Sequence, residues 1–228
     1  MEIRDRMKKS EFWGAMILLG LHVVLFPVLL NLYAFKLQKY FSVAQLNFMY
    51  YSLSTVLVFA YLGRFLRRSF DVLLDNILRC LKYFALAWLV YYGLALVVSP
   101  LLGLINAADV NANDENVLTM LDSERGVVMA MTVFLAPLVE ECIFRGGLFC
   151  GLQDKSRVLA YGVSIAAFCI YHVWQYALIN MDLAYLIYAL QYVPAAVALC
   201  WCYDKSGSIW TSIAFHMAFN FMSLKLVM

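Results

Sequence analysis

Two adjacent carboxylates and an arginine lie in the middle of one apolar stretch, at Glu140, Glu141 and Arg145. Glu141 and Arg145 are four residues apart, so they share a helix face and can neutralise each other. Glu140 points about 100° away at 3.6 residues per turn, which leaves its carboxylate free to act as a base. Pro137, just before the pair, bends or starts a helix and favours a pocket that holds water. The competing interpretation is a buried ion pair with a spare hydrogen-bonded acid, although an ion pair needs only one carboxylate.

Two later apolar stretches carry one histidine each. His172 follows Phe168 and Tyr171 and so lies among aromatic residues, and Asn220 lies four residues after His216, so those two share a helix face. Alone, His172 could be a core histidine, and His216 with Asn220 could be a hydrogen bond between helices. At about 1.5 Å per residue, Glu140 and these polar residues reach similar depths along their stretches. This coincidence favours one shared site.

The elements that must position these residues are membrane-spanning helices. Hydrophobic residues make up 64% of the 228 and charged residues 14%, whereas about a quarter of a soluble domain is charged. A helix crosses the hydrocarbon layer with about 20 apolar residues. We therefore predict an all-α fold, a polytopic transmembrane helix bundle that forms a single integral membrane domain over residues 1–228. The seven predicted spans are residues 12–35, 46–63, 83–104, 127–151, 158–179, 184–203 and 208–227.

Charge sets the expected orientation of the spans. Residues 65–82 are amphipathic and basic, which suits a cytoplasmic membrane surface, although this stretch could also be an eighth span. Residues 105–126 are rich in Asp and Glu and are expected to form a polar extracytoplasmic loop. The amino terminus is then cytoplasmic in a plasma (cell) membrane, with the loop of Lys36 and Lys39 outside. The first apolar stretch is too long for a signal peptide and is expected to be a retained span.

Several classes of site are disfavoured by the remaining residues. A net charge of +2 without a basic patch argues against a nucleic-acid partner. The six cysteines lie in or beside apolar stretches and form no C-x-x-C pair, so we expect neither a disulfide framework nor a thiolate zinc site. His22, the only other histidine, has no polar partner nearby in its stretch. We expect it to be structural or lipid-interfacial and assign it no role. The oligomeric state is open.

The motifs Glu140-Glu141-x-x-x-Arg145, Phe168-x-x-x-His172 and His216-x-x-x-Asn220 follow one another on three separate predicted spans. In this order they resemble the three motifs of the CAAX protease and bacteriocin-processing family. That family of intramembrane glutamic endopeptidases includes the Ras-converting endopeptidase and many bacterial membrane proteins of the abortive-infection type. The resemblance covers about residues 127–227, the family-like catalytic core. Known members have around eight spans.

The resemblance implies metal-free hydrolysis of a membrane-associated peptide or protein, with no cofactor. Glu140 would be the base, and His172 would orient and polarise the water. His216 and Asn220 would stabilise the oxyanion, and the remaining motif residues Glu141, Arg145 and Phe168 would support them.

Three other functions stay open from the residues alone. Glu140, His172 and His216 could bind zinc as two histidines and a carboxylate with an open position, although the sequence has no H-E-x-x-H helix. A non-catalytic membrane regulator or bacteriocin-immunity scaffold could use the same bundle to bind a partner. A proton-coupled transporter would also place acids and histidines inside the membrane, but no internal repeat is evident.

Overall fold

The computed structural model describes residues 7–227, which are helical apart from short connections and contain no strand. The first helix runs without interruption through α1 (Lys9–Leu19), the π-helical stretch η1 (Gly20–Leu25) and α2 (Phe26–Leu37). Two long helices follow, α3 (Val43–Asp75) and α4 (Ile77–Leu104). Ser42 begins α3 with a capping box, because its hydroxyl accepts from the Gln45 N–H while the Gln45 side chain accepts from the Ser42 N–H.

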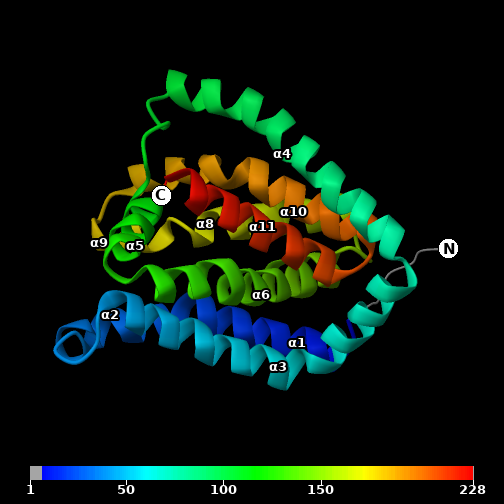
Figure 1. Ribbon diagram of the computed structural model, residues 1–228, viewed down its shortest axis with the longest axis horizontal. Coiled ribbons are helices and arrows are strands. Elements are labelled where there is room, and N and C mark those ends of the chain that lie inside the picture. The colour runs from blue at the N-terminus through cyan, green and yellow to red at the C-terminus, as the bar shows by residue number, and fades with distance from the viewer. Residues whose placement is uncertain (1–6, 228) are drawn as a thin grey trace.

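The second half of the chain builds the centre of the bundle (Figure 1). One continuous helix contains α5 (Ala112–Ala130), the π-helical stretch η2 (Met131–Leu135), α6 (Ala136–Glu141), the π-helical stretch η3 (Cys142–Phe149) and α7 (Cys150–Leu152). It is followed by α8 (Arg157–Tyr171), the short α9 (Trp174–Ile179), the 3-10 helix η4 (Leu183–Tyr192), α10 (Val193–Ser206) and α11 (Ile209–Val227). Gly207 has φ of 85° in the turn between α10 and α11, a left-handed conformation that glycine adopts without strain.

A helix occupies each of the seven stretches predicted to span the membrane. Five helical segments of residues 7–227 are long and apolar enough to cross a bilayer: Lys9–Leu37, Val43–Asp75, Ile77–Leu104, Ala112–Leu152 and Leu183–Ser206. The apolar helix Arg157–Tyr171 is shorter, and α11 is made less apolar by His216, Asn220 and Lys225. The all-α class and the integral membrane character are confirmed, and the number of spans stays a prediction.

The structure corrects two predicted connections. Residues 65–82 are not a separate element: they are the end of α3 and the start of α4, joined at Asn76, whose φ of −132° and ψ of 36° break the helix. The predicted loop of residues 105–126 is non-helical only to Asn111, whose side chain accepts from the N–H groups of Asn113 and Asp114 and so caps α5. Asp114 and Glu115 also suit the positive end of that helix.

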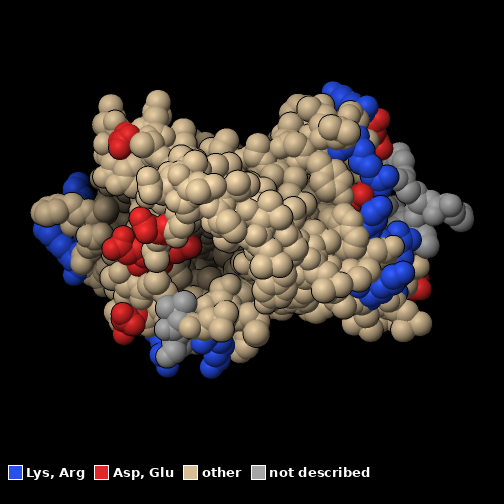
Figure 2. Space-filling model, turned by 90° about the horizontal axis from the view of Figure 1, so that it is seen from above, with Lys and Arg blue, Asp and Glu red and all other residues tan. Residues whose placement is uncertain are grey.

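The two ends of the bundle differ in charge (Figure 2). We call the end that holds the α3–α4 elbow the basic end; its lysines and arginines are Lys8, Lys9, Arg64, Arg67, Arg68, Arg79, Lys82, Lys155, Arg157 and Lys205. The opposite end, which we call the acidic end, carries Asp109, Asp114, Glu115, Asp122, Glu124 and Asp182, together with Lys36, Lys39, Arg125 and Lys225. Helices from distant parts of the sequence are tied together at the basic end, where Arg68 pairs with Glu11 at 2.8 Å and Arg79 Nε donates to the Lys205 carbonyl at 2.8 Å.

Candidate active site

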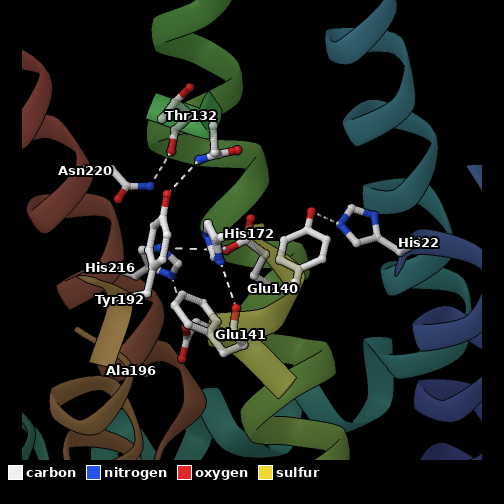
Figure 3. Close-up of polar contacts among 12 residues, drawn as sticks. His22, Thr132, Glu140, Glu141, His172, Tyr192, Ala196, His216 and Asn220 are labelled. Carbon is white, nitrogen blue, oxygen red and sulfur yellow. Dashed lines mark hydrogen bonds and ion pairs between the residues drawn. The ribbon is translucent and has the colours of Figure 1, made fainter. Parts of the chain in front are cut away.

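The helix that carries the two carboxylates is irregular on both sides of them. Ala136 N–H donates to the Met131 carbonyl, five residues back, which is the π-helical pattern. The next residue, Pro137, has no N–H, so the Thr132 carbonyl lacks the corresponding helical donor. Asn220 of α11 fills this place, because its Nδ2 donates to Thr132 O at 2.9 Å (Figure 3). A side chain from a neighbouring helix thus stabilises the helix break predicted at Pro137.

Glu141 is fully buried, and both of its carboxylate oxygens accept hydrogen bonds. Its carboxylate accepts from Arg145 Nη1 at 2.7 Å, from His216 Nδ1 at 3.0 Å and from the Ser212 hydroxyl. The Arg145 guanidinium is also fully buried and lies 4.3 Å from the centre of the Phe168 ring, close enough for a cation–π contact. A carboxylate held by these three donors is suited to positioning His216, and little of it is left to act as a base.

Glu140 lies one residue away and faces a different set of groups. It is 4% exposed. Its Oε1 accepts a hydrogen bond from the Tyr51 hydroxyl at 3.3 Å. Its Oε2 lies 4.0 Å from Nε2 of His172 and 3.9 Å from Nε2 of His216 (Figure 3). These distances exceed a direct hydrogen bond and suit a water molecule between the groups.

The hydrogen bonds behind the two histidines fix which nitrogen faces Glu140. A carbonyl oxygen only accepts, so His172 Nδ1 donates to Phe168 O at 2.8 Å. His216 Nδ1 donates to the Glu141 carboxylate for the same reason. Each neutral ring therefore presents Nε2 as an acceptor toward Glu140. His172 is not inside a continuous span as predicted for residues 158–179: α8 ends before it, and the chain resumes a helix only after Val173.

Two further residues of the site, both aromatic, are not among those predicted from the sequence. Tyr51 of α3 contacts Glu140 as described, and Tyr192 at the end of η4 stacks on His172 with ring centres 4.3 Å apart. The Tyr192 hydroxyl lies 2.9 Å from Asn111 Oδ1 and 2.8 Å from Asp114 Oδ1. These contacts join the start of α5 to the histidine. No local signal marks either tyrosine, because both are ordinary aromatic residues of apolar stretches.

A cavity of about 730 Å³ connects these groups to the acidic end. The side chains that line it include the predicted Glu140, Phe168, His172, His216 and Asn220. Glu141 and Arg145 lie behind this layer, in the protein interior. From the site the cavity extends past Asn47 and Gln175 to Asn113 and Asn116 near the start of α5. Figure 2 shows the surface hollowed beside the Asp and Glu side chains of the acidic end.

The zinc site that the sequence leaves open would use Glu140, His172 and His216 as ligands. Within residues 7–227, no group of three or more His, Cys, Asp and Glu side chains has the arrangement of a metal site. Two ligand atoms of a tetrahedral zinc, each at about 2.0–2.1 Å from the metal, lie roughly 3.3 Å apart. The distances of 4.0 and 3.9 Å from Glu140 Oε2 to the two Nε2 atoms are longer.

Comparison with known proteins gives a match to a family model. Residues 123–222 match the family model described as type II CAAX prenyl endopeptidase Rce1-like. No curated protein and no solved structure matches the chain. The matched region contains all three motifs and confirms the resemblance seen in the sequence. Residues 123–222, from the second half of α5 to most of α11, are therefore similar to the Rce1-like family of type II CAAX prenyl endopeptidases.

Proposed function

We propose that the protein is an intramembrane endopeptidase in which Glu140 activates a water molecule. One observation carries the proposal: Glu140 Oε2 lies 4.0 Å from His172 Nε2 and 3.9 Å from His216 Nε2, in a cavity inside an apolar bundle. Peptide hydrolysis requires a confined water, a base and donors for the oxyanion. The family whose model matches residues 123–222 is a protease family.

Glu140 acts twice in the hydrolysis, first as a base and then as an acid. The water, oriented by His172, loses a proton to Glu140 as its oxygen bonds to the scissile carbonyl carbon. In the resulting tetrahedral intermediate the carbon–nitrogen bond breaks, and the proton held by Glu140 passes to the departing amine. Glu141 cannot take this part as readily, because Arg145, His216 and Ser212 already occupy its oxygens.

His216 and Asn220 are the proposed donors for the oxyanion. An amide NH₂ has two hydrogens, and Asn220 uses one of them on the Thr132 carbonyl. The second hydrogen is available to a substrate oxygen in the cavity. His216, whose Nδ1 is held by the Glu141 carboxylate, faces the same oxygen and would contribute to its stabilisation through a proton on Nε2.

The charge of the two ends gives the proposed orientation. Lysine and arginine are enriched on the cytoplasmic side of membrane proteins, so the basic end, with α1 starting there, lies in the cytoplasm of a cell whose plasma membrane holds the protein. The cavity extends toward the acidic end. The proposed substrate is therefore a membrane-associated peptide or protein whose cleavage site reaches the site from the non-cytoplasmic half of the bilayer.

The decisive experiment compares membranes and secreted peptides from cells that express the wild-type protein or Glu140→Gln. Fragments made by the wild type should be absent with Glu140→Gln, while the uncleaved precursor accumulates. Glu115→Gln is the matched control, because Glu115 is an exposed acid of the acidic end, and it should give the wild-type pattern. If Glu140→Gln preserves both the fragments and the cellular phenotype, the partner-binding scaffold is the better account.

A further inference from the structure

His22, to which the sequence assigned no role, is completely buried and belongs to a polar cluster beside the site. Its exposed fraction is 0%, so of the two expected positions, structural or lipid-interfacial, the lipid-interfacial one is wrong. Its Nδ1 lies 2.9 Å from Ser54 Oγ, and its Nε2 lies 2.9 Å from the Tyr50 hydroxyl and 3.0 Å from the Tyr171 hydroxyl. Ser54 and Tyr50 come from α3, and Tyr171 ends α8.

The backbone at His22 determines where the Tyr50 proton goes. Phe26 N–H donates to the Leu21 carbonyl, five residues back. Pro27 follows and has no N–H, which leaves the His22 carbonyl without the corresponding helical donor. The Tyr50 hydroxyl donates to that carbonyl at 2.8 Å. This arrangement is the same as the one that joins Asn220 to the break at Pro137.

The contacts of His22 then give a consistent order for the other protons of the cluster. Because the single Tyr50 hydroxyl proton is used on the His22 carbonyl, His22 Nε2 meets Tyr50 as a donor and shares its one hydrogen between the Tyr50 and Tyr171 hydroxyls, while Nδ1 accepts from Ser54. Tyr171 accepts from Nε2 and can donate to the Tyr51 hydroxyl, 2.9 Å away. Tyr51 in turn donates to Glu140 Oε1 at 3.3 Å, since a carboxylate only accepts.

We propose that His22 is a positioning residue for Glu140, acting through Tyr171 and Tyr51. The directed chain holds Oε1 as the acceptor of the Tyr51 proton and so turns Oε2 toward His172 and His216, where the water is activated. This inference rests on the proposed endopeptidase function. A merely structural cluster would stabilise the packing of α3 and α8 around η1 and leave the turnover of folded protein unchanged.

The test measures kcat and KM separately in purified variants. The probe is an internally quenched peptide that contains the cleavage site found by comparing wild type with Glu140→Gln. Tyr51→Phe removes one hydroxyl bonded to a charged group, and we expect a fall in kcat of about 10-fold to 100-fold, with KM changed by less than about 2-fold. His22→Leu should lower kcat by about 10-fold, and His22→Gln, whose amide keeps a donor and an acceptor, should recover part of it.

The double variant His22→Leu with Tyr51→Phe should be no slower than Tyr51→Phe alone, because residues that act in one chain are not additive. Tyr161→Phe is the matched control: its hydroxyl also donates to a carboxylate, that of Asp204 at 3.2 Å, but at the basic end. Its kcat should equal that of the wild type. If Glu140→Gln cleaves the probe, the endopeptidase proposal fails. If Glu140→Gln is inactive while Tyr51→Phe keeps the wild-type kcat, or if the two effects multiply, only the role of His22 fails.

Discussion

Replacing Glu141 with glutamine should destabilise the protein strongly, whereas the same change at Glu140 should not. The two residues are adjacent and both buried, with exposed fractions of 0% and 4%. They differ in the charge of their partners. Glu141 is the ion-pair partner of Arg145 at 2.7 Å, while the hydrogen bond that Glu140 receives comes from a neutral tyrosine hydroxyl.

The contacts give the expected size of the two effects. After Glu141→Gln, Arg145 keeps its bond to the Ala196 carbonyl and its contact with the Phe168 ring, but it loses its counter-charge. Breaking a buried ion pair costs about 3–5 kcal/mol, which corresponds to a fall in Tm of roughly 6–20 °C for a domain of this size. Glu140→Gln retains an acceptor oxygen for Tyr51 and should cost about 1 kcal/mol or less.

Thermal unfolding of the purified proteins in detergent, followed by circular dichroism, measures both costs. The double variant Glu141→Gln with Arg145→Gln should melt higher than Glu141→Gln alone, because neither charge is then left unpaired. Cleavage should be lost in all of these variants. A Tm for Glu141→Gln within about 2 °C of the wild-type value, or a double variant that is no more stable than the single one, would refute the argument from the unpaired charge.

Three further predictions test the metal, the orientation and the helix break. Chelator-treated protein should keep its cleavage activity and contain no stoichiometric zinc by elemental analysis; a complete loss that zinc restores would favour the metalloprotease. The six native cysteines are buried, so a single introduced cysteine can report the orientation. Asn116→Cys, in the cavity lining, should react with a membrane-impermeant maleimide added outside intact cells, whereas Arg67→Cys at the basic end should react only after permeabilisation. The opposite pattern of labelling would show that the orientation is inverted. Asn220→Ala should lower the free energy of unfolding by about 1–3 kcal/mol by leaving the Thr132 carbonyl unpaired. That cost should shrink in a Pro137→Ala background, which restores an N–H at position 137, and an unchanged cost would show that Thr132 is not the partner that matters.

The spacing of residues along the sequence was enough to predict several features of this protein. Apolar stretches of about 20 residues indicate membrane helices wherever they occur, because the lipid leaves the backbone few alternatives. The spacing of four between Glu141 and Arg145 places them on one face in any helix. The order of the three motifs was enough to recognise the protease family, and the matched region, residues 123–222, agrees.

Connections were predicted less well, because their conformation depends on caps and breaks of single residues. Asn111 starts α5 within what composition alone indicates as a polar loop. Asn76 turns the predicted surface segment into an elbow between two long helices. Overall polarity gives no information on either effect.

The partners of the site residues were decided only by the tertiary structure. His22 is 149 positions from Tyr171, and Tyr51 is 89 positions from Glu140, so no local pattern could pair them. Both pairs form because packed helices bring polar groups together in an interior where most buried polar groups are hydrogen-bonded. The sequence by itself determined which residues can carry out the chemistry, since that follows from residue type and helical period. The packing of the helices decided which oxygen of Glu140 is held by a tyrosine and which faces the histidines.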